Sequence, residues 1–420
     1  MKSPLPVFAG RISLDEMLNP RTKRQKHTIR NSELRWMRAA LRLARRGYGA
    51  TSPNPMVGAV LVKGGKTIGR GWHRRAGLPH AEIEALHDAQ RRGHNLRGAT
   101  LYVTLEPCCT RGRTPPCTDA IVAAGIKRVV IGATDPNPKH SGRAFKILQR
   151  AGIETVHGIL SDECARLNEA FSHWIIRRTP FVTVKAAMTL DGKIATAGGE
   201  SKWITAEKAR AHGMKLRQGS DAILAGINTI LADDPGLTAR MVQSPSAFAK
   251  LRRDEKSKVQ SQKTLRRIIL DSRARTPLTA KVVSDEFAAL TTVVVGKHAS
   301  KSHVATLAKR VNVLIAPRRE SQISNLKSQI DLRWLLKKLG AENVTSLLVE
   351  GGGEVNASFL LGGLAQRVAF FYAPKILGGD SRKAVAGVGA KNLAEALSLR
   401  DVEWKRLGPD LLLTAKVVAG

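Results

Sequence analysis

The stretch that decides the fold of the first half of the chain reads Pro79-His80-Ala81-Glu82, followed by Thr104-Leu105-Glu106-Pro107-Cys108 and then Pro115-Pro116-Cys117. The histidine begins a predicted helix, and the first cysteine follows a predicted strand. One imidazole and two thiolates fill three corners of a zinc tetrahedron and leave the fourth for water. The spacing therefore predicts a catalytic zinc site held by His80, Cys108 and Cys117.

Glu82 is the predicted catalytic residue of this site. Two thiolate ligands cancel the formal charge of zinc, so the metal acidifies water mainly by polarising it, and a separate group must carry protons. Glu82 lies two residues after His80, which matches the H-x-E … P-C signature of zinc deaminases. The competing hypothesis is a closed structural site with Cys109 as fourth ligand. Adjacent cysteines point in different directions, and a closed site would give Glu82 no task.

Outward from these motifs, the apolar periodicity alternates between helix and strand. Such alternation is typical of an α/β/α layered domain. We expect this domain over residues 31–178, after a basic mobile leader over residues 1–30. Its predicted helices cover residues 33–46, 81–92, 118–124 and 142–151, and its predicted strands cover 57–62, 100–105 and 128–131.

A second α/β domain is predicted over residues 179–420, because Pro180 and its charged flank interrupt the pattern. Residues 241–265 are rich in Ser, Lys, Arg and Gln and are expected to form an inserted loop. Helices are predicted over 206–218 and 331–338. The predicted strands are apolar runs over 181–187, 222–226, 267–270, 291–296, 311–316, 344–350 and 367–372.

A glycine cluster follows the strand predicted over residues 344–350. Gly351, Gly352 and Gly353 lead into a predicted helix, and glycines at a helix N-terminus let backbone N–H groups approach a phosphate. The third glycine of the G-x-G-x-x-G fingerprint is absent, because Asn356 stands there. Taken alone, the cluster is compatible with an anion cradle or with a plain tight turn.

Several longer runs carry a family resemblance. Residues 51–60, 71–73, 80–82 and 104–117 resemble the deaminase domain of the bifunctional deaminase/reductase of riboflavin biosynthesis. Cytidine and transfer-RNA deaminases have a short P-C-x-x-C unit, whereas Cys108 and Cys117 are separated by a longer loop, typical of the riboflavin enzyme. The runs 184–195, 201–205, 220–226 and 231–240 resemble the reductase domain of the same enzyme, which is similar to dihydrofolate reductase.

The resemblance implies a cytidine-deaminase-like α/β/α domain followed by a dihydrofolate-reductase-like α/β domain. It further implies zinc-dependent hydrolytic deamination of 2,5-diamino-6-(5-phosphoribosylamino)pyrimidin-4-one, and then reduction of its ribosyl group to ribityl by NADPH. Expected substrate contacts are Asn54, Ser201, Arg217, Leu237, Arg240 and Glu350. Expected NADPH contacts are Ala187, Trp203, Thr229, Asp233, Gly352, Gly353, Glu354, Val355, Asn356, Ala357 and Ser358.

The net charge of the chain indicates which classes of molecule it can bind. The 420 residues include 69 Lys and Arg against 34 Asp and Glu, a net charge of +35, which favours polyanions or anionic small substrates. The alternative function is a nucleic-acid base-editing deaminase with an accessory domain, but an aromatic content of 4% is low for stacking bases. We expect a phosphoribosylaminopyrimidine as substrate and no specific nucleic-acid partner.

The cellular setting follows from segments that the sequence lacks. No apolar run has the roughly 18 residues of a membrane span, and the charged N-terminus does not resemble a secretory signal. Three of the four cysteines lie within ten residues, which suits metal binding better than a disulfide framework. These observations predict a cytoplasmic protein that does not bind membranes. A homo-oligomer is expected as well, although no sequence feature determines the oligomeric state.

Overall fold

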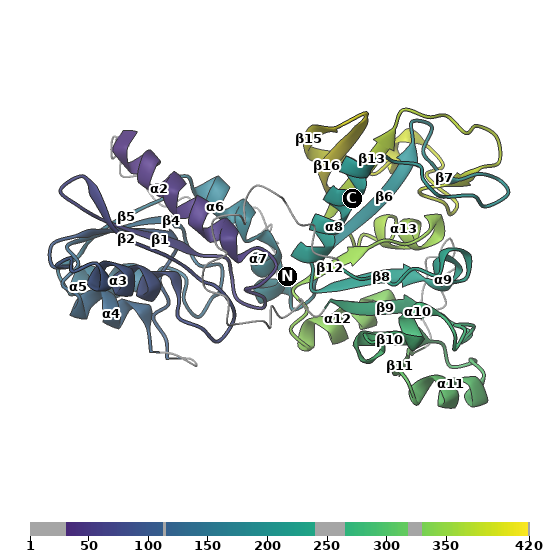
Figure 1. Cartoon of the computed structure of the whole chain (residues 1–420), viewed down its shortest axis with the longest axis horizontal. Helices are drawn as coiled ribbons and strands as arrows, with labels where there is room; N and C mark the ends of the chain where they lie inside the picture. The colour runs from purple at the N-terminus through teal and green to yellow at the C-terminus, as the bar shows by residue number, and fades with distance from the viewer. Residues whose placement is uncertain (1–30, 112–114, 240–264, 318–329, 419–420) are drawn as a thin grey trace, which may run out of the picture. The chain divides into compact units, whose positions relative to one another are not determined.

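The computed structural model (Figure 1) describes residues 31–111, 115–239, 265–317 and 330–418. The predicted leader over 1–30, the loop residues 112–114, Arg240 and all of the predicted insertion except Leu265 lie outside the described residues. The described chain forms two compact units. The first comprises residues 31–44, 57–72 and 79–165, and the second comprises 45–56, 73–78 and the remainder from Arg166. Among the described residues, no helix has the length and apolar character that a membrane span requires.

A five-stranded sheet forms the centre of the first unit, in the order β2-β1-β3-β4-β5. β1 runs antiparallel to both of its neighbours, and β3, β4 and β5 are parallel. Consecutive parallel strands need a crossover helix, which explains the strand and helix alternation of the sequence. The strands are β1 (Gly58–Lys63), β2 (Lys66–Trp72), β3 (Thr100–Leu105), β4 (Arg128–Ala133) and β5 (Glu154–His157).

Glycines let helices approach both faces of this sheet. A Cβ at Gly58 would lie 2.1 Å from the Ala40 carbonyl oxygen of α2, and one at Gly71 would lie 2.2 Å from the Ala81 oxygen of α3. Gly71 pairs with Ala59, so it faces the side opposite to Gly58. The expected α/β/α layering is thus confirmed. The helices are α2 (Asn31–Ala44), α3 (Ala81–Arg91), α4 (Cys117–Ala123), α5 (Arg143–Arg150) and α6 (Ser161–Leu167), which ends at the start of the second unit.

The second unit contains a nine-stranded sheet in the order β11-β10-β9-β8-β12-β6-β13-β16-β15. The strands from β11 to β13 are parallel, and β16 and β15 add an antiparallel hairpin. A small sheet pairs β7 (Lys193–Ala195) with β14 (Arg382–Lys383). The strands are β6 (Phe181–Thr189), β8 (Ala222–Gly226), β9 (Arg266–Leu270), β10 (Thr291–Val295), β11 (Asn312–Ile315), β12 (Ser346–Val349), β13 (Arg367–Ala373), β15 (Leu399–Leu407) and β16 (Asp410–Val417).

Apolar clusters cover both faces of this sheet. Val184 and Leu224 pack with Leu335 and Phe359 on one face, and Ile223 packs with residues such as Val293 and Leu307 on the other. Burial on both faces explains why the parallel strands are continuous apolar runs. The helices are α7 (Glu169–Arg177), α8 (Glu207–Gly219), α9 (Ile227–Asp233), α10 (Lys281–Ser284), α11 (Lys301–Ala308), α12 (Leu332–Ala341) and α13 (Gly353–Leu360), and short 3₁₀ turns occur at Arg45–Gly47, Ala288–Leu290 and Leu393–Glu395.

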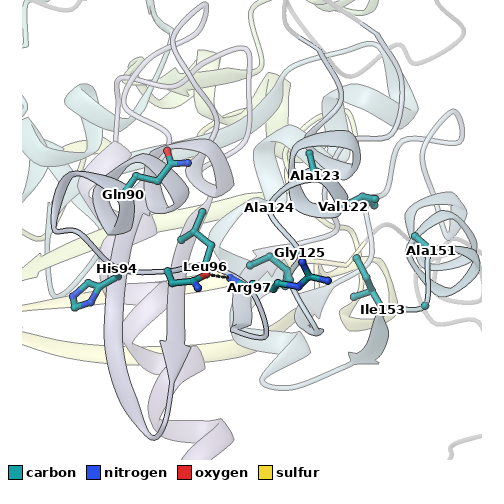
Figure 2. A pocket seen from close by; sticks show the side chains of 13 residues that line it. Gln90, His94, Leu96, Arg97, Val122, Ala123, Ala124, Gly125, Ala151 and Ile153 are labelled. Carbon is teal, nitrogen blue, oxygen red and sulfur yellow. Dashed lines mark hydrogen bonds between the residues drawn. The ribbon is translucent and has the colours of Figure 1, made fainter.

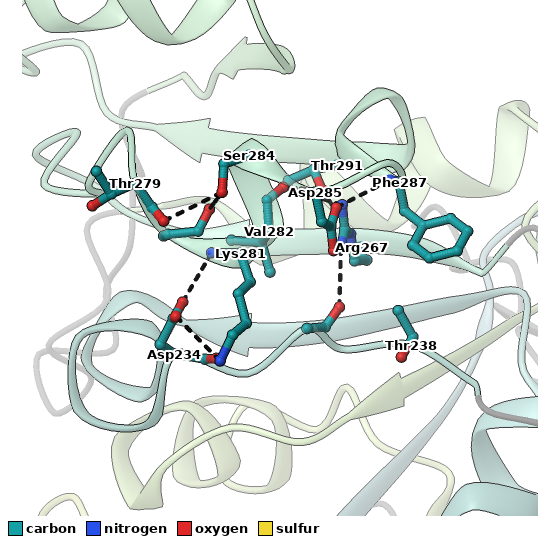
Figure 3. A network of polar contacts seen from close by, with 12 residues as sticks. Asp234, Thr238, Arg267, Thr279, Lys281, Val282, Ser284, Asp285, Phe287 and Thr291 are labelled. Carbon is teal, nitrogen blue, oxygen red and sulfur yellow. Dashed lines mark hydrogen bonds and ion pairs between the residues drawn. The ribbon is translucent and has the colours of Figure 1, made fainter.

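A buried arginine supports the segment before residue 240. Arg267 is 1% exposed, and its guanidinium donates two 2.7 Å hydrogen bonds to the Asp285 carboxylate and one of 3.0 Å to the Gly236 carbonyl (Figure 3). A buried charge is tolerated only when it is paired and hydrogen-bonded, as this one is. The network fixes the backbone next to Leu237, a predicted substrate residue.

Candidate active sites

Three predicted metal ligands meet in the first unit. His80 is the residue before α3, Cys117 is the first residue of α4, and Cys108 follows β3. The His80 Nδ1 atom lies 3.5 Å from Cys108 Sγ and 3.3 Å from Cys117 Sγ, and all three donor atoms lie within 4.8 Å of one another. Two helix starts and one strand end therefore bring the three ligands to one edge of the sheet.

These donors fit zinc. Zn–S bonds of about 2.3 Å and Zn–N bonds of about 2.0 Å place the ligands of a tetrahedral site roughly 3.5 to 3.8 Å apart, close to the separations given above. Cys109 is not part of the group. Its sulfur lies 3.7 Å from His140 Nδ1 instead, and burial raises the pKa of its thiol.

The two thiols of the group are hydrogen-bonded to each other. The Cys117 thiol hydrogen-bonds to Cys108 and, with His80, lowers the pKa of Cys108 to about 4. The Cys117 backbone N–H also donates to Cys108 Sγ, at 3.3 Å. Sharing a proton with Cys108 raises the pKa of Cys117. Zinc binding needs both sulfurs as thiolates, so loading the site releases the shared proton.

Glu82 is buried beside these sulfurs. Its side chain is 3% exposed, and it contacts the Cys117 thiol. Burial, followed by the negative charge of Cys108, raises the pKa of Glu82 to about 7. A carboxyl group with a pKa near neutrality can both take up and release a proton at physiological pH.

Asn54, the predicted contact for the sugar side of the deaminase substrate, contacts a buried histidine through its side chain. Its side-chain amide lies 3.1 Å from Nε2 of the buried His73. Both residues belong to segments that group with the second unit. Whether Asn54 contacts substrate stays a prediction.

A pocket of about 570 Å³ in the first unit lies away from these residues (Figure 2). It is bounded by the C-terminal ends of α3, α4 and α5, whereas the metal ligands stand at the N-terminal ends of α3 and α4. None of the predicted site residues lines it. Its lining includes Gln90, His94, Leu96, Arg97, Val122 and Ile153.

In the second unit, two predicted substrate residues bind each other. Arg217 Nε and Nη2 each donate a 2.8 Å hydrogen bond to the Glu350 carboxylate, and Nη1 donates to the Thr238 carbonyl. The Lys185 ammonium lies 3.5 Å from the same carboxylate. Burial alone would raise the pKa of Glu350, but the charges of Arg217 and Lys185 outweigh it and lower the value to about 2. The guanidinium of Arg217, a predicted substrate contact, is thus paired with Glu350.

Lys185 was not among the residues predicted from sequence. It lies on β6 two positions before Ala187, a predicted NADPH contact, so both side chains share one face of the strand. Two sequence signals point to Lys185: it is a lone charge inside an apolar strand, and it lies in the run 184–195 that resembles the reductase domain. Such a charge is seldom buried without a partner or a function.

Two other predicted contacts, Ser201 and Asp233, meet at the end of α9. The Ser201 hydroxyl donates a 2.9 Å hydrogen bond to Asp233, and the Lys202 ammonium lies 3.8 Å from the same carboxylate. Trp203 is 65% exposed, with the Arg210 guanidinium 4.8 Å from its ring centre. Leu237, by contrast, is a buried core residue.

The glycine loop has the features of an anion cradle. α13 has no side-chain cap, and Gly352 precedes its first residue. A Cβ at Gly352 would meet nothing closer than Thr229 Oγ1 at 3.9 Å, whereas one at Gly353 would lie 2.3 Å from the Lys383 carbonyl oxygen. The backbone N–H groups at this helix start therefore fit a cofactor phosphate.

Side chains further along α13 turn inward. Asn356, Ala357 and Ser358 are buried, and Asn356 donates a 2.8 Å hydrogen bond to the Ala384 carbonyl. The Asn356 backbone N–H donates a 3.0 Å hydrogen bond to the Gly352 carbonyl, and its side-chain Oδ1 has no hydrogen-bond partner among the described residues. Whether these three residues contact a cofactor stays a prediction. Glu354 is exposed in the first turn.

Comparisons with known proteins identify the family. The family model described as RibD C-terminal domain matches residues 180–413, and the model of the cytidine and deoxycytidylate deaminase zinc-binding region matches residues 30–133. The riboflavin biosynthesis protein RibD of Aquifex aeolicus is 42% identical over 388 residues, which cover 92% of this chain and 99% of that protein. The chain belongs to the RibD family.

Other RibD proteins match over a similar length. The Escherichia coli protein is 39% identical over 90% of this chain and 97% of its own length. Among solved structures, Acinetobacter baumannii RibD superposes with a TM-score of 0.77 at 35% identity, covering 92% of this chain and 99% of that one. A Thermotoga maritima structure, described as a diaminohydroxyphosphoribosylaminopyrimidine deaminase/5-amino-6-(5-phosphoribosylamino)uracil reductase, has a TM-score of 0.74 at 34% identity, over 92% of this chain and 99% of that one.

RibD family membership confirms the predicted two-domain α/β fold and the bifunctional enzyme class, a zinc-dependent deaminase joined to an NADPH-dependent reductase of riboflavin biosynthesis. Both halves of the chain match the same kind of protein. The alternative, a base-editing deaminase with an unrelated accessory domain, is therefore not favoured.

Proposed function

We propose that this RibD protein first removes the C2 amino group of 2,5-diamino-6-(5-phosphoribosylamino)pyrimidin-4-one by hydrolysis and then reduces the ribosyl group of the product to ribityl. The observation that carries the first step is the group of His80, Cys108 and Cys117 with Glu82 buried beside it. The second step is supported by the Glu350 cluster, which consists of Lys185, Arg217 and Glu350, and by the uncapped glycine loop before α13.

The roles of the deaminase residues follow from their chemistry. Bound zinc would supply Lewis-acid polarisation of the attacking water. Glu82 takes a proton from that water as its oxygen attacks C2, and delivers a proton to the amino group as the C–N bond breaks and ammonia leaves. A pKa of about 7 for Glu82 suits both transfers.

In the reductase site, opening of the ribosyl ring breaks the C1′–O4′ bond, makes O4′ a hydroxyl and leaves a C1′=N double bond; NADPH would supply the hydride to C1′, and the nitrogen takes up a proton. We propose that the Lys185 ammonium donates a hydrogen bond to O4′ as the ring opens. Glu350 holds the Lys185 ammonium in place, and Arg217 in turn holds the Glu350 carboxylate. The start of α13 would hold a phosphate of the cofactor through backbone N–H groups.

The direct test is to give the purified protein the diaminopyrimidine phosphate, with and without NADPH, and to identify the products by mass. We expect the deaminated ribosyl compound without NADPH and the ribityl compound with it. A protein that releases no ammonia, or that oxidises NADPH without the mass change of reduction, would refute the proposal.

We also propose a cytoplasmic homo-oligomer without a specific nucleic-acid partner. The exposed face of the β15–β16 hairpin supports self-association, because Leu399, Trp404 and Leu411 are apolar and solvent-facing. Large exposed apolar patches mark interaction surfaces. The exposed charges of the hairpin have both signs, with Arg400, Lys405, Arg406 and Lys416 beside Asp401 and Glu403. We propose that its exposed apolar side chains pack against a second copy of the chain.

The hairpin can be tested by sedimentation. Trp404→Glu should produce monomers, whereas Val122→Glu, at an exposed apolar position of the first unit, should leave the oligomer intact. A monomeric wild-type protein would refute self-association, and an oligomeric Trp404→Glu protein would refute the surface.

A further inference from the structure

Glu106 is a buried carboxylate that the proposed chemistry does not use. Its side chain is 3% exposed and accepts three hydrogen bonds from backbone N–H groups. Oε2 accepts from Asp135 at 3.1 Å and from Gly142 at 3.0 Å, and Oε1 accepts from Ala144 at 3.0 Å. Hydrogen bonds to a charged acceptor are stronger than those between neutral groups. The Glu106 side chain thus holds the turn over residues 135–144 through three backbone hydrogen bonds.

The position of Glu106 links this turn to the metal ligands. Glu106 comes directly after β3 and two residues before Cys108, and its own N–H donates a 2.9 Å hydrogen bond to the Ala133 carbonyl at the end of β4. The backbone entering Pro107 and Cys108 is therefore fixed from two directions. Glu106 contributes no atom to the ligand group itself.

The turn also contacts the chain on the other side of Cys108. His140 Nδ1 lies 3.7 Å from Cys109 Sγ, and His140 Nε2 lies 3.4 Å from the Thr110 hydroxyl. Residues before and after Cys108 are therefore both held by the same turn. A ligand on an otherwise irregular segment gains a fixed position from such neighbours, as metal ligands do from the groups that orient them.

We infer that Glu106 is a positioning residue that holds the Cys108 segment in ligand geometry and slows the release of zinc. This inference rests on the proposed zinc site. A carboxylate is required because every partner is a donor. In Glu106→Gln, the amide NH₂ would face at least one backbone N–H, so a buried hydrogen bond would be replaced by a donor–donor contact.

The test is the rate at which zinc passes from the loaded, full-length protein to a chromogenic chelator. We expect Glu106→Gln to release zinc at least about 10-fold faster than wild type, in line with the effect of removing groups that support metal ligands. Deaminase activity should fall, whereas NADPH oxidation with the deaminated intermediate should stay at the wild-type rate. That second activity reports that the rest of the protein is intact.

Glu33→Gln is the matched control. Glu33 is a buried carboxylate of the same unit, and it pairs with Arg128 at 2.7 Å. The Glu33→Gln protein should have a lower unfolding temperature than wild type but the same rate of zinc release. Equal acceleration by both variants would mean general loosening of the unit and would overturn the positioning role.

His140→Ala keeps the inference testable if Glu106→Gln does not fold, because it removes only the outer contact of the turn. It should speed zinc release several-fold. Unchanged release from zinc-loaded Glu106→Gln, or from His140→Ala where the first variant does not fold, would overturn the inference alone. A wild-type protein that binds no zinc would overturn the proposed function as well.

Discussion

Two buried carboxylates show how neighbours set the chemistry of a residue. Burial and the nearby Cys108 raise the pKa of Glu82 to about 7. At Glu350, Arg217 and Lys185 outweigh the effect of burial and lower the pKa to about 2. One glutamate is therefore ready to exchange protons near neutral pH, while the other stays ionised and serves as a fixed charge.

The first prediction tests Glu82. Glu82→Gln should lower the deaminase rate by roughly 10² to 10⁴, because it removes the group that carries protons. Zinc content should stay at one ion per chain, as measured by atomic absorption, because Glu82 is not a ligand. Cys108→Ser should instead lose zinc, whereas Cys109→Ser should keep both zinc and activity. A Cys109→Ser protein without zinc would revive the closed-site hypothesis.

His173 gives a pH-dependent prediction. Burial, and then the charge of Arg177, lowers the pKa of His173 from 6.5 to about 4. Between these values the unfolded chain binds a proton that the folded chain does not, so the free energy of unfolding should fall as the pH drops from about 6.5 towards about 4, by roughly 1–3 kcal/mol. Denaturant unfolding over this range measures the slope.

His173→Phe is the comparison, since it keeps a ring beside Phe181. It should give a flatter dependence of stability on pH. Parallel curves for the two proteins would show that His173 does not titrate in this way.

Functional residues could be predicted from the sequence where they lie in motifs. The sequence allowed the zinc-site residues His80, Glu82, Cys108 and Cys117 to be identified, because zinc chemistry restricts residue type and spacing. The structure brings the three ligands together. The roles of Lys185 and Glu106 come from partners far along the chain, which no local pattern records. The same holds for the pairing of Arg217 with Glu350, which are 133 residues apart.

At the scale of elements, glycines set how closely α3 approaches the sheet. The backbone of α3 passes so near to β2 that a Cβ at Gly71 would lie 2.2 Å from one backbone atom and 2.4 Å from another. Backbone atoms cannot move aside as a flexible side-chain end can. Since His80 and Glu82 stand at the start of α3, this contact also fixes the zinc site.

The corresponding prediction is that Gly71→Ala destabilises the first unit by about 3 kcal/mol through overpacking and weakens zinc binding. Gly198→Ala is the control, because its new Cβ would meet only Thr196 Oγ1 at 3.9 Å. Thermal unfolding and zinc titration should separate the two variants. Equal behaviour would mean that α3 can shift without cost.

Periodicity predicted the central strands of both sheets but missed β2, β15 and also β16, although Leu412, Leu413 and Ala415 of β16 are buried. The central parallel strands were expected from apolar runs, and the structure confirms them. β2 was missed because two glycines and two basic residues break its apolar pattern. β15 was missed because eight of its nine residues are exposed, so its sequence carries charges on both faces. Strand pairing at a sheet edge, rather than burial, defines such a strand.

At the scale of the whole molecule, the ligands of the zinc site and the Glu350 cluster belong to different compact units. We predict that Glu82→Gln and Glu350→Gln proteins, each unable to complete the pathway alone, together convert the diaminopyrimidine to the ribityl product when mixed. Mass spectrometry of the mixture provides the measurement. Absence of product would mean that the intermediate does not leave the chain that makes it.

Charge gives a second prediction at this scale. If the net charge of +35 only attracts a small anionic substrate, raising salt from about 50 to 200 mM should weaken apparent substrate affinity modestly, since screening acts over roughly 10 Å. Binding to RNA, which we expect to be weak and independent of sequence, should fall far more steeply. Deaminated bases in bound RNA, abolished by Glu82→Gln, would contradict a purely metabolic role.

The strand order of the nine-stranded sheet also bears on how the chain is synthesised. β6 lies between β12 and β13, so residues 181–189 leave the ribosome long before residues 346–373, which pair with them. At about 5–20 residues per second, this gap lasts roughly 10–30 s. The sheet of the first unit, in contrast, is complete once residue 157 has emerged. The nascent chain therefore carries a finished deaminase sheet and an unpaired apolar strand at the same time, and chaperone demand is expected to peak in that interval.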